Sequence, residues 1–303
     1  MALGLPSRLP RDAPLRDVLA RGDRTFSFEF FPPRDDDGER QLWNAIRRLE
    51  GLSPTFVSVT YGAGGTTRDR TVRVTERIAT DTTLRPVGHL TCVGHSRAEL
   101  RSIIGQYAGA GVRTVMALRG DPPGGPGQPW VRHAEGLDHA VELVEMLHEL
   151  GDFSVGVAAF PQVHPEAVDA DADAQVLADK ARAGADFAAT QMFFRPGDYV
   201  DLVDRAARHG CEIPIVPGIM PITSWAQLNR FAQLSGDAVP PEVVARLEPW
   251  RDDKQALRAE GIVIATELCD AVLTAGAPGL HFYTLNRSNA SREIYQNLAV
   301  GVG

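Results

Sequence analysis

Cysteine is scarce in this chain of 303 residues, which contains only Cys92, Cys211 and Cys269. The three lie far apart and form no C-x-x-C pair, whereas disulfide frameworks and structural zinc sites need denser patterns. We therefore expect three free thiols, no metal site and a location in the cytoplasm.

Long apolar runs are also lacking. No run approaches the roughly 20 residues that a helix needs to cross a bilayer. The first 24 residues mix Arg, Asp and Pro and contain no apolar stretch of the kind found in secretion signals. We expect no membrane partner.

An excess of basic residues is missing as well. The 31 Lys and Arg residues are outnumbered by 39 Asp and Glu residues, which gives a net charge of −8. A general binder of phosphate backbones needs clustered basic residues, so we expect no nucleic-acid partner. The balance still allows one local basic pocket for a single anionic ligand. At 44% hydrophobic and 23% charged residues, the composition is typical of an ordinary globular protein with a large core.

Eight short, β-rich apolar segments recur along the chain. Most are nearly continuous hydrophobic runs, which is typical of strands buried on both faces of a parallel sheet. Helical patterns fill the gaps between them, for example at 39–50, 97–111 and 136–151, and later patterns begin near Ala172, Asp198, Trp225 and Ala256. The expected strands are 25–31, 55–62, 86–93, 114–120, 154–160, 187–194, 213–219 and 279–285.

This alternation predicts eight βα units, which can close into a (β/α)₈ barrel. The alternative is an open doubly wound sheet. Against it, the nearest approach to a dinucleotide-binding glycine loop, at 62–67, lacks the third glycine. We expect an α/β protein with a single (β/α)₈ TIM barrel over residues 25–303, preceded by an extended or helical lead-in over residues 1–24. The acidic segment 168–175 is interpreted as a solvated loop and helix start.

In such barrels the active site lies at the carboxyl ends of the strands. Glu29 is the most informative candidate, because it lies between Phe28 and Phe30 in an apolar strand. Burial raises the pKa of a carboxyl group, which favours a protonated general acid near neutral pH. The alternative is a structural Glu paired with an arginine such as Arg287.

Other polar residues at the strand ends also have structural interpretations. His89 can be a hydrogen-bonded core histidine, and Gln191 can cap a buried carbonyl. The segment 122–129 is either a mobile lid or a long connection. His133, His139 and His148 lack a set of partner carboxylates, which argues against a metal site. The residues alone therefore suggest acid–base chemistry on a small polar substrate and do not name the reaction.

Eight segments, in this order, resemble the methylenetetrahydrofolate reductase family, in its bacterial form that consists of the catalytic domain only. Each segment is a weak signal by itself, but eight in order with compatible spacing are specific. The resemblance extends from about Phe26 to Leu298. The segments are FEFFPPR (28–34), FVSVTYGAGG (56–65), HLTC (89–92), ALRGDPP (117–123), VAAFPQVHPEA (157–167), ATQMFF (189–194), PGIMP (217–221) and HFYTLNR (281–287).

The resemblance implies a flavin-bearing (β/α)₈ barrel with FAD at its mouth. NADH or NADPH reduces the flavin, which passes a hydride to 5,10-methylenetetrahydrofolate and yields 5-methyltetrahydrofolate, the methyl source for methionine. The two substrates take turns, which gives ping-pong kinetics. The resemblance also implies a homo-oligomer. Without the C-terminal regulatory domain of eukaryotic relatives, we expect no inhibition by S-adenosylmethionine.

The resemblance also assigns roles to residues. Glu29 matches the general acid, and Asp121 matches a carboxylate that stabilises the cationic form of the folate. Gln191, Trp225 and Arg287 match substrate-binding residues, the arginine facing the folate carboxylates. Lys180 matches a cation that meets the FAD pyrophosphate. The FAD-binding residues carried over are Thr60, Tyr61, Ala63, His89, Arg119, Gly120, Asp121, Ala140, Phe160, His164, Asp173 and Lys180.

The chain departs from the family pattern at several of these positions. Phe160 stands where many relatives have Tyr, and Gln162 replaces a common Glu. Val176 and Asp179 stand where some relatives offer polar or basic groups to FAD. We therefore predict weaker FAD retention than in relatives. Two alternatives stay open: another flavin barrel, such as a proline dehydrogenase-like enzyme, and a cofactor-binding paralogue without turnover.

Overall fold

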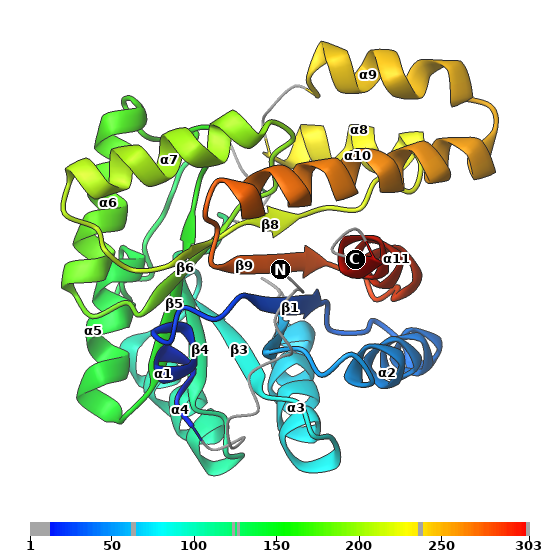
Figure 1. Ribbon diagram of the computed structural model, residues 1–303. Coiled ribbons are helices and arrows are strands. Elements are labelled where there is room, and N and C mark those ends of the chain that lie inside the picture. Colours follow the sequence, from blue (N-terminus) through cyan, green and yellow to red (C-terminus); the bar gives the residue numbers. More distant parts are fainter. Residues whose placement is uncertain (1–12, 62–64, 123–124, 126–127, 236–238, 301–303) are drawn as a thin grey trace.

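The computed structural model describes residues 13–61, 65–122, 125, 128–235 and 239–300. Its described strands form one parallel sheet in the order β7-β6-β5-β4-β3-β2-β1-β9-β8, with the helices around the outside (Figure 1). The strands are β1 (Thr25–Phe30), β2 (Phe56–Val59), β3 (Pro86–Thr91), β4 (Thr114–Leu118), β5 (Ser154–Ala159), β6 (Phe187–Thr190), β7 (Ile215–Val216), β8 (Gly218–Ile219) and β9 (Gly279–Tyr283).

The seventh predicted strand is two short strands, because Pro217 interrupts it and has no N–H for a ladder. Its first half pairs with β6, where Ile215 lies opposite Ala188. Its second half pairs with β9, where Gly218 lies opposite His281. One segment thus joins both edges of the sheet and nearly closes the ring. The TIM barrel is confirmed, and the open doubly wound sheet is wrong.

Helices alternate with the strands as the sequence pattern predicts. Their starts carry side-chain caps: Asp35 accepts from the N–H of Gly38, and Asp169 accepts from the N–H of Ala172. The acidic segment 168–175 is therefore a helix start, as predicted. The helices are α2 (Asp36–Glu50), α3 (Gly65–Asp81), α4 (Arg97–Gly109), α5 (Ala140–Leu150), α6 (Ala170–Arg182), α7 (Pro196–Arg208), α8 (Trp225–Ser235), α9 (Pro241–Leu247), the 3₁₀ helix Glu248–Trp250, α10 (Lys254–Thr274) and α11 (Asn289–Val300).

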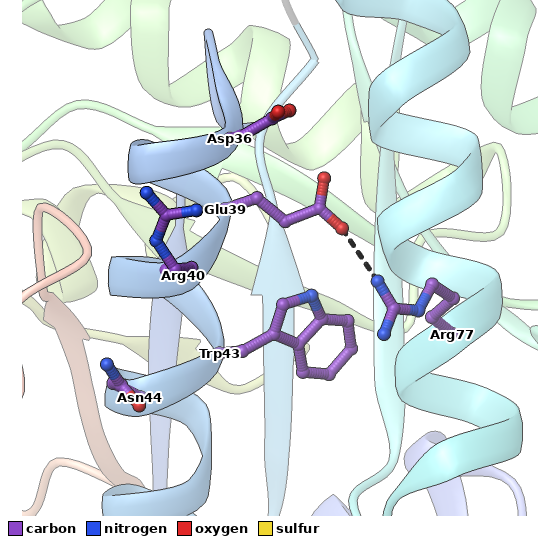
Figure 2. Close-up of a pocket in the computed structure, with 6 residues that line it drawn as sticks. All are labelled: Asp36, Glu39, Arg40, Trp43, Asn44 and Arg77. Atoms are coloured by element: carbon purple, nitrogen blue, oxygen red, sulfur yellow. Dashed lines mark hydrogen bonds and ion pairs between the residues drawn. The ribbon is translucent and has the colours of Figure 1, made fainter.

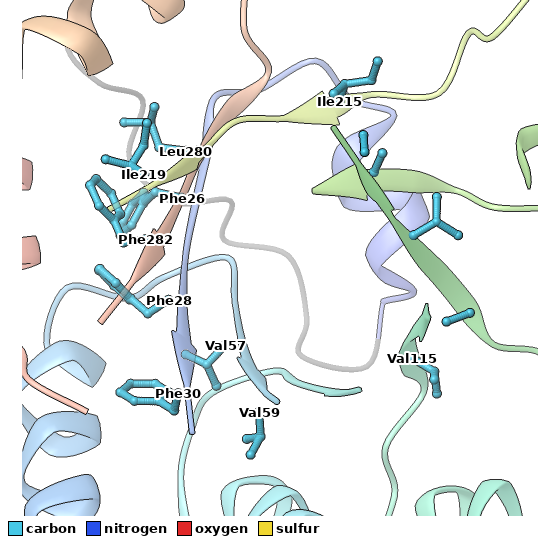
Figure 3. Packing of buried hydrophobic residues seen from close by; sticks show 14 of the residues in the cluster. Phe26, Phe28, Phe30, Val57, Val59, Val115, Ile215, Ile219, Leu280 and Phe282 are labelled. Atoms are coloured by element: carbon cyan, nitrogen blue, oxygen red, sulfur yellow. The ribbon is translucent and has the colours of Figure 1, made fainter. Parts of the chain in front are cut away.

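The two faces of β1 differ in chemistry. Phe26, Phe28 and Phe30 are buried in the main hydrophobic core between the sheet and the helices (Figure 3). Successive side chains of a strand point to opposite faces, so Ser27 and Glu29 point into the barrel. The outer face supplies the apolar packing, and the inner face is free to carry polar groups.

Helix α1 (Leu15–Leu19) packs on the amino-terminal end of the barrel. Its Leu15 and Val18 are fully buried in one cluster with Phe56, Val87 and Phe187, which lie near the starts of their strands. The division between lead-in and barrel at residue 25 stays a prediction. One end of the barrel is thus filled with apolar side chains, and the carboxyl ends of the strands form the other.

Three further observations concern the expected absences. The three cysteines are free and buried. No helix in the described ranges is long and apolar enough to cross a membrane. Among the described residues, no three or more His, Cys, Asp and Glu side chains gather in a way that could hold a metal ion.

Candidate active site

The carboxylate of Glu29 lies inside the barrel and is only 8% exposed. Its Oε2 is 3.3 Å from Nε2 of His281 and 3.5 Å from Oγ of Ser58, which donates to it. Nε2 of His89 lies 3.5 Å from the same oxygen without forming a hydrogen bond. These groups come from β1, β9, β2 and β3, which are neighbours in the sheet. The barrel thus gathers four polar side chains at one point.

The surroundings of Glu29 overturn two expectations. Arg287 is exposed and makes no described ion pair with Glu29, so the alternative of a structural arginine pair is wrong. Burial does raise the pKa of the Glu29 carboxyl, but hydrogen bonding by His281 and the charge of His89 outweigh it and hold that pKa below its ordinary value. This direction favours the ionised carboxyl, opposite to the predicted protonated resting state.

Sequence reasoning missed three residues in or beside this cluster, namely His281, Ser58 and Ser27. His281 contributes its imidazole from β9, and Ser27 lies 2.7 Å from its Nδ1. Their signal was present in the alternation of the strands, because Ser27 and Glu29 occupy one face of β1. His281 is the first residue of the segment 281–287 but was not singled out as a candidate.

A second group of predicted residues forms a cationic cluster beyond β4 and β5. Besides burial, the charge of the Arg119 guanidinium lowers the pKa of Lys180, and both cations act on His164. Asp173 accepts a hydrogen bond from the His164 backbone at 3.1 Å. The ring of Phe160 packs edge-on against His164, with centroids 4.7 Å apart. Five of the predicted FAD-binding residues are thus brought together.

Lys180 is the least solvated cation of this cluster. Its Nζ donates to the carbonyl of Ala158 at 3.0 Å. Burial and the charge of Arg119 lower the pKa of Lys180 and Asp173 opposes them, which brings this pKa to about 8. Burial and the charge of Arg119 also lower the pKa of His164. Cations held close together in this way favour an anionic ligand.

Arg119 already has an anionic partner in the chain. Its two terminal nitrogens lie 2.6 Å from the two carboxylate oxygens of Glu166, a bidentate pair. The guanidinium also lies over the Trp130 ring, 4.7 Å from its centroid. Glu166 is half-exposed and was not among the predicted residues. An anion that approaches Arg119 therefore meets a carboxylate that competes for the guanidinium.

The other predicted FAD-binding residues lie at the expected strand ends. Thr60 and Tyr61 follow β2, and the Tyr61 hydroxyl lies 3.2 Å from Nε2 of His95. Gly120 has a φ of +84°, and a Cβ there would lie 2.6 Å from the side chain of Val93, so glycine is needed at this turn. Ala140 is the buried first residue of α5, Asp121 is exposed just after Gly120, and Ala63 lies outside the described residues.

The predicted substrate-binding residues are more widely spread. Gln191 is exposed directly after β6, and Arg287 is exposed after β9. Trp225 begins α8 and is half-buried, with Arg251 stacked 4.4 Å from its ring centroid. No described hydrogen bond or ion pair links these side chains to one another or to Glu29. Gln191 and Arg287 follow the carboxyl ends of their strands, and Trp225 begins the helix that follows β8.

Two of the departures from the family pattern lie on α6. Val176 is 45% exposed. The carboxylate of Asp179 accepts from Arg182 and, at 3.0 Å, from Nε2 of Gln175. The ion pair with Arg182 in the same helix therefore offsets part of the negative charge of Asp179.

A groove of about 500 Å³ lies elsewhere, on the outer surface between α2 and α3 (Figure 2). Glu39 lies in it between Arg73 and Arg77, and Arg77 stacks 4.3 Å from the Trp43 ring centroid. These side chains pair with one another on the helical layer. The groove is distinct from the strand ends and contains none of the predicted site residues.

Residues 14–299 match the sequence profile of methylenetetrahydrofolate reductase. The chain belongs to this family. It is 41% identical over 283 residues to 5,10-methylenetetrahydrofolate reductase of Salmonella typhimurium, covering 93% of each chain. It is 40% identical over 295 residues to the enzyme of that name from Escherichia coli, covering 97% of each.

The fold has a solved counterpart at lower identity. An uncharacterized protein from Clostridium thermocellum that binds two copies of 5-methyl-5,6,7,8-tetrahydrofolic acid aligns with a TM-score of 0.65 at 15% identity. The alignment covers 95% of this chain and 98% of that one, and it supports the barrel fold. Family membership confirms the resemblance seen in the eight segments and supports an oxidoreductase that reduces methylenetetrahydrofolate.

Proposed function

We propose that this protein uses FAD and NADH or NADPH to reduce 5,10-methylenetetrahydrofolate to 5-methyltetrahydrofolate by a ping-pong mechanism. The observation that carries the proposal is the Glu29 carboxylate, buried with two histidines inside a barrel of this family. A buried carboxyl group with a proton source beside it is what protonation of a weakly basic ring nitrogen requires.

The cationic cluster supports FAD as the cofactor. Arg119 and Lys180 concentrate positive charge on a chain whose net charge is −8. Lys180 has no ion pair within the described ranges, so its remaining N–H groups are available to a phosphate. The donor set therefore fits a pyrophosphate. Bound FAD would supply hydride transfer between the two substrates.

The other predicted residues around the barrel mouth have separate roles in this proposal. Glu29 delivers a proton to the substrate nitrogen, and Asp121 stabilises the positive charge that this step creates. Gln191 and Trp225 orient the bound substrate, and Arg287 pairs with the folate carboxylates. Thr60, Tyr61, His89, Gly120 and Ala140, with the cationic cluster, bind FAD.

Three further properties belong to the proposal. FAD is retained weakly, because Val176 offers no polar group on α6 and Glu166 competes for Arg119. The three buried free thiols support a location in the cytoplasm. The homo-oligomer rests on the family resemblance.

An anaerobic absorbance titration tests the proposed function. The purified protein, supplied with FAD, is mixed first with NADH or NADPH and then with methylenetetrahydrofolate. We expect the flavin band to bleach with the nucleotide and to return with the folate. A flavin that bleaches but returns only with another acceptor would favour a different flavin barrel, such as a proline dehydrogenase-like enzyme. A protein inert with all three ligands would be a paralogue without turnover.

Glu29→Gln tests the proposed acid. The amide keeps the size of the side chain but cannot supply the proton, so the folate half-reaction should slow by about 10²–10⁴-fold. Reduction of the flavin by the nucleotide should stay within about threefold of wild type, because that half-reaction needs no acid at this position. Stopped-flow absorbance separates the two steps.

The matched control is Glu39→Gln, in the outer groove between α2 and α3. It makes the same chemical change outside the barrel and should leave both half-reactions unchanged. If Glu29→Gln slowed both half-reactions equally, the assigned role of Glu29 would be wrong.

A further inference from the structure

A chain of hydrogen bonds leads away from Glu29 into the barrel wall. Ser27 Oγ donates to the carbonyl of Leu280 at 3.3 Å and lies 2.7 Å from Nδ1 of His281. Nε2 of the same ring lies 3.3 Å from Oε2 of Glu29. Ser27 is 0% and His281 is 2% exposed, so bulk water does not satisfy these atoms.

Counting hydrogens shows that this chain, with all three contacts made, holds one proton more than a neutral imidazole and an ionised carboxylate supply. Its three contacts need three hydrogens. The Ser27 hydroxyl supplies one, and a neutral His281 imidazole supplies one. Buried polar atoms are almost always paired, so the third hydrogen is an extra proton on either His281 or Glu29.

The assignment of one hydrogen decides which nitrogen exchanges that proton. With the Ser27 hydrogen assigned to the carbonyl of Leu280, a lone pair of the Ser27 oxygen accepts from Nδ1 of His281, which then carries a hydrogen. Nε2 is the atom left to gain and lose a proton. An ionised Glu29 accepts from Nε2–H, and a neutral Glu29 donates to bare Nε2. All three contacts are satisfied in both states.

We propose that His281 is a positioning residue that stores the proton Glu29 delivers, and that the proton moves along the single contact between Nε2 and Oε2. In this step the Nε2–H bond breaks and the Oε2–H bond forms, which neutralises both groups. Delivery to the substrate leaves a neutral imidazole and a carboxylate, and water returns the proton after product release. Storage rests on these contacts and on the assigned Ser27 hydrogen, whereas delivery rests on the proposed function.

Among the described groups that face His281, Glu29 is the one that exchanges a proton with it. Glu29 faces it from β1, His89 from β3 and Tyr283 from its own strand. Burial lowers the pKa of His89, although the charge of Glu29 opposes this, and burial raises the pKa of Tyr283.

Nuclear magnetic resonance of ¹⁵N-histidine-labelled, substrate-free protein tests storage directly. The His281 signals are those absent from His281→Gln. We expect Nδ1 to keep its hydrogen from pH ~5 to ~9, while Nε2 titrates together with the Glu29 carboxyl carbon. Loss of the Nδ1 hydrogen within that range, or independent titration of the two residues, would overturn the proposal.

The pH profile of the folate half-reaction tests delivery. The wild-type rate of the folate half-reaction should not change with pH over the range in which the pair of His281 and Glu29 holds its proton. In His281→Gln, Glu29 must take its proton from solution, so log rate should fall with pH at a slope of about −1. His148→Gln, a surface change on α5, should keep the wild-type profile. A level profile in His281→Gln would overturn the proposal.

The experiments separate a failure of the proposed function from a failure of proton storage, and they allow for a variant that does not fold. A wild-type protein that does not reduce the folate contradicts the proposed function, while the resonance titration still decides storage. If His281→Gln does not fold, Ser27→Ala replaces it, since it removes the acceptor of Nδ1. We then expect the neutral imidazole to move its hydrogen from Nδ1 to Nε2. An unchanged tautomer would count against the assigned chain.

Discussion

At the scale of the residue, Lys180 shows how position alters an ordinary side chain. A lysine is normally charged at every physiological pH, but the pKa of this one is lowered to about 8. Burial on α6 and the charge of the nearby Arg119 lower it, and Asp173 only partly offsets both. The charge available to a phosphate at this point therefore changes close to neutral pH.

We predict that FAD affinity falls as pH rises through about 8, because Lys180 is charged below that pKa and neutral above it. Loss of the charge should weaken binding by about tenfold, equivalent to roughly 1.4 kcal/mol. Fluorescence titration of the apoprotein with FAD at several pH values measures this. Lys180→Met should bind FAD weakly at every pH, and its affinity for FAD should not fall as pH rises.

The control for Lys180 is Lys254→Met, which removes an exposed lysine at the start of α10. It should bind FAD as wild type does at each pH. An affinity for FAD that is constant from pH ~7 to ~9 in wild type would show that Lys180 does not hold the phosphate.

At the scale of the element, the join between β7 and β8 is closely packed. Gly218 donates its N–H to Oγ1 of Thr190 at 2.8 Å, and the Tyr283 hydroxyl donates to the Thr190 carbonyl. A Cβ on Gly218 would lie 2.3 Å from that carbonyl oxygen. Glycine is needed here because the Thr190 backbone and the Tyr283 side chain both approach it closely.

We predict that Gly218→Ala lowers the free energy of unfolding by about 1–3 kcal/mol, because the added methyl group forces β6 and β9 apart. Urea denaturation followed by circular dichroism measures the change. Gly105→Ala is the control, since a Cβ on this α4 glycine meets no atom within 4 Å. That change should stabilise the protein by about 0.5–1 kcal/mol. Equal effects at both positions would contradict the close approach.

At the scale of the whole molecule, the two ends of the barrel serve different purposes. The amino-terminal end is filled by α1, whose Leu15 and Val18 meet Phe56 and Phe187. The carboxyl end carries Glu29 and the cationic cluster. The fold thus separates the packing that stabilises the barrel from the polar groups at the mouth.

We predict that Leu15→Ala lowers the free energy of unfolding by about 2–5 kcal/mol, since Leu15 is fully buried and its loss leaves a cavity. The affinity for FAD should not change, because α1 lies at the opposite end of the strands. Chemical denaturation and FAD titration of one sample measure both. Asp17→Ala, on the exposed face of the same helix, should stay within about 0.5 kcal/mol. A fall in FAD affinity with Leu15→Ala would contradict this separation.

The sequence by itself determined the fold class and the candidates at the strand ends. Near-continuous apolar segments such as 114–120, alternating with helical patterns, indicated a parallel barrel because these are local properties of the chain. The position of Glu29 in an apolar strand was likewise visible in the sequence. The family resemblance followed from eight segments in order.

Only the tertiary structure decided the state of Glu29 and its partners. The pKa of a buried carboxyl depends on the groups that face it, and His89 and His281 reach Glu29 from strands that are adjacent in space but distant along the chain. The Glu166 partner of Arg119 and the break at Pro217 were also missed. Sequence periodicity reports which face a side chain occupies, whereas the closure of the barrel decides which side chains meet inside it.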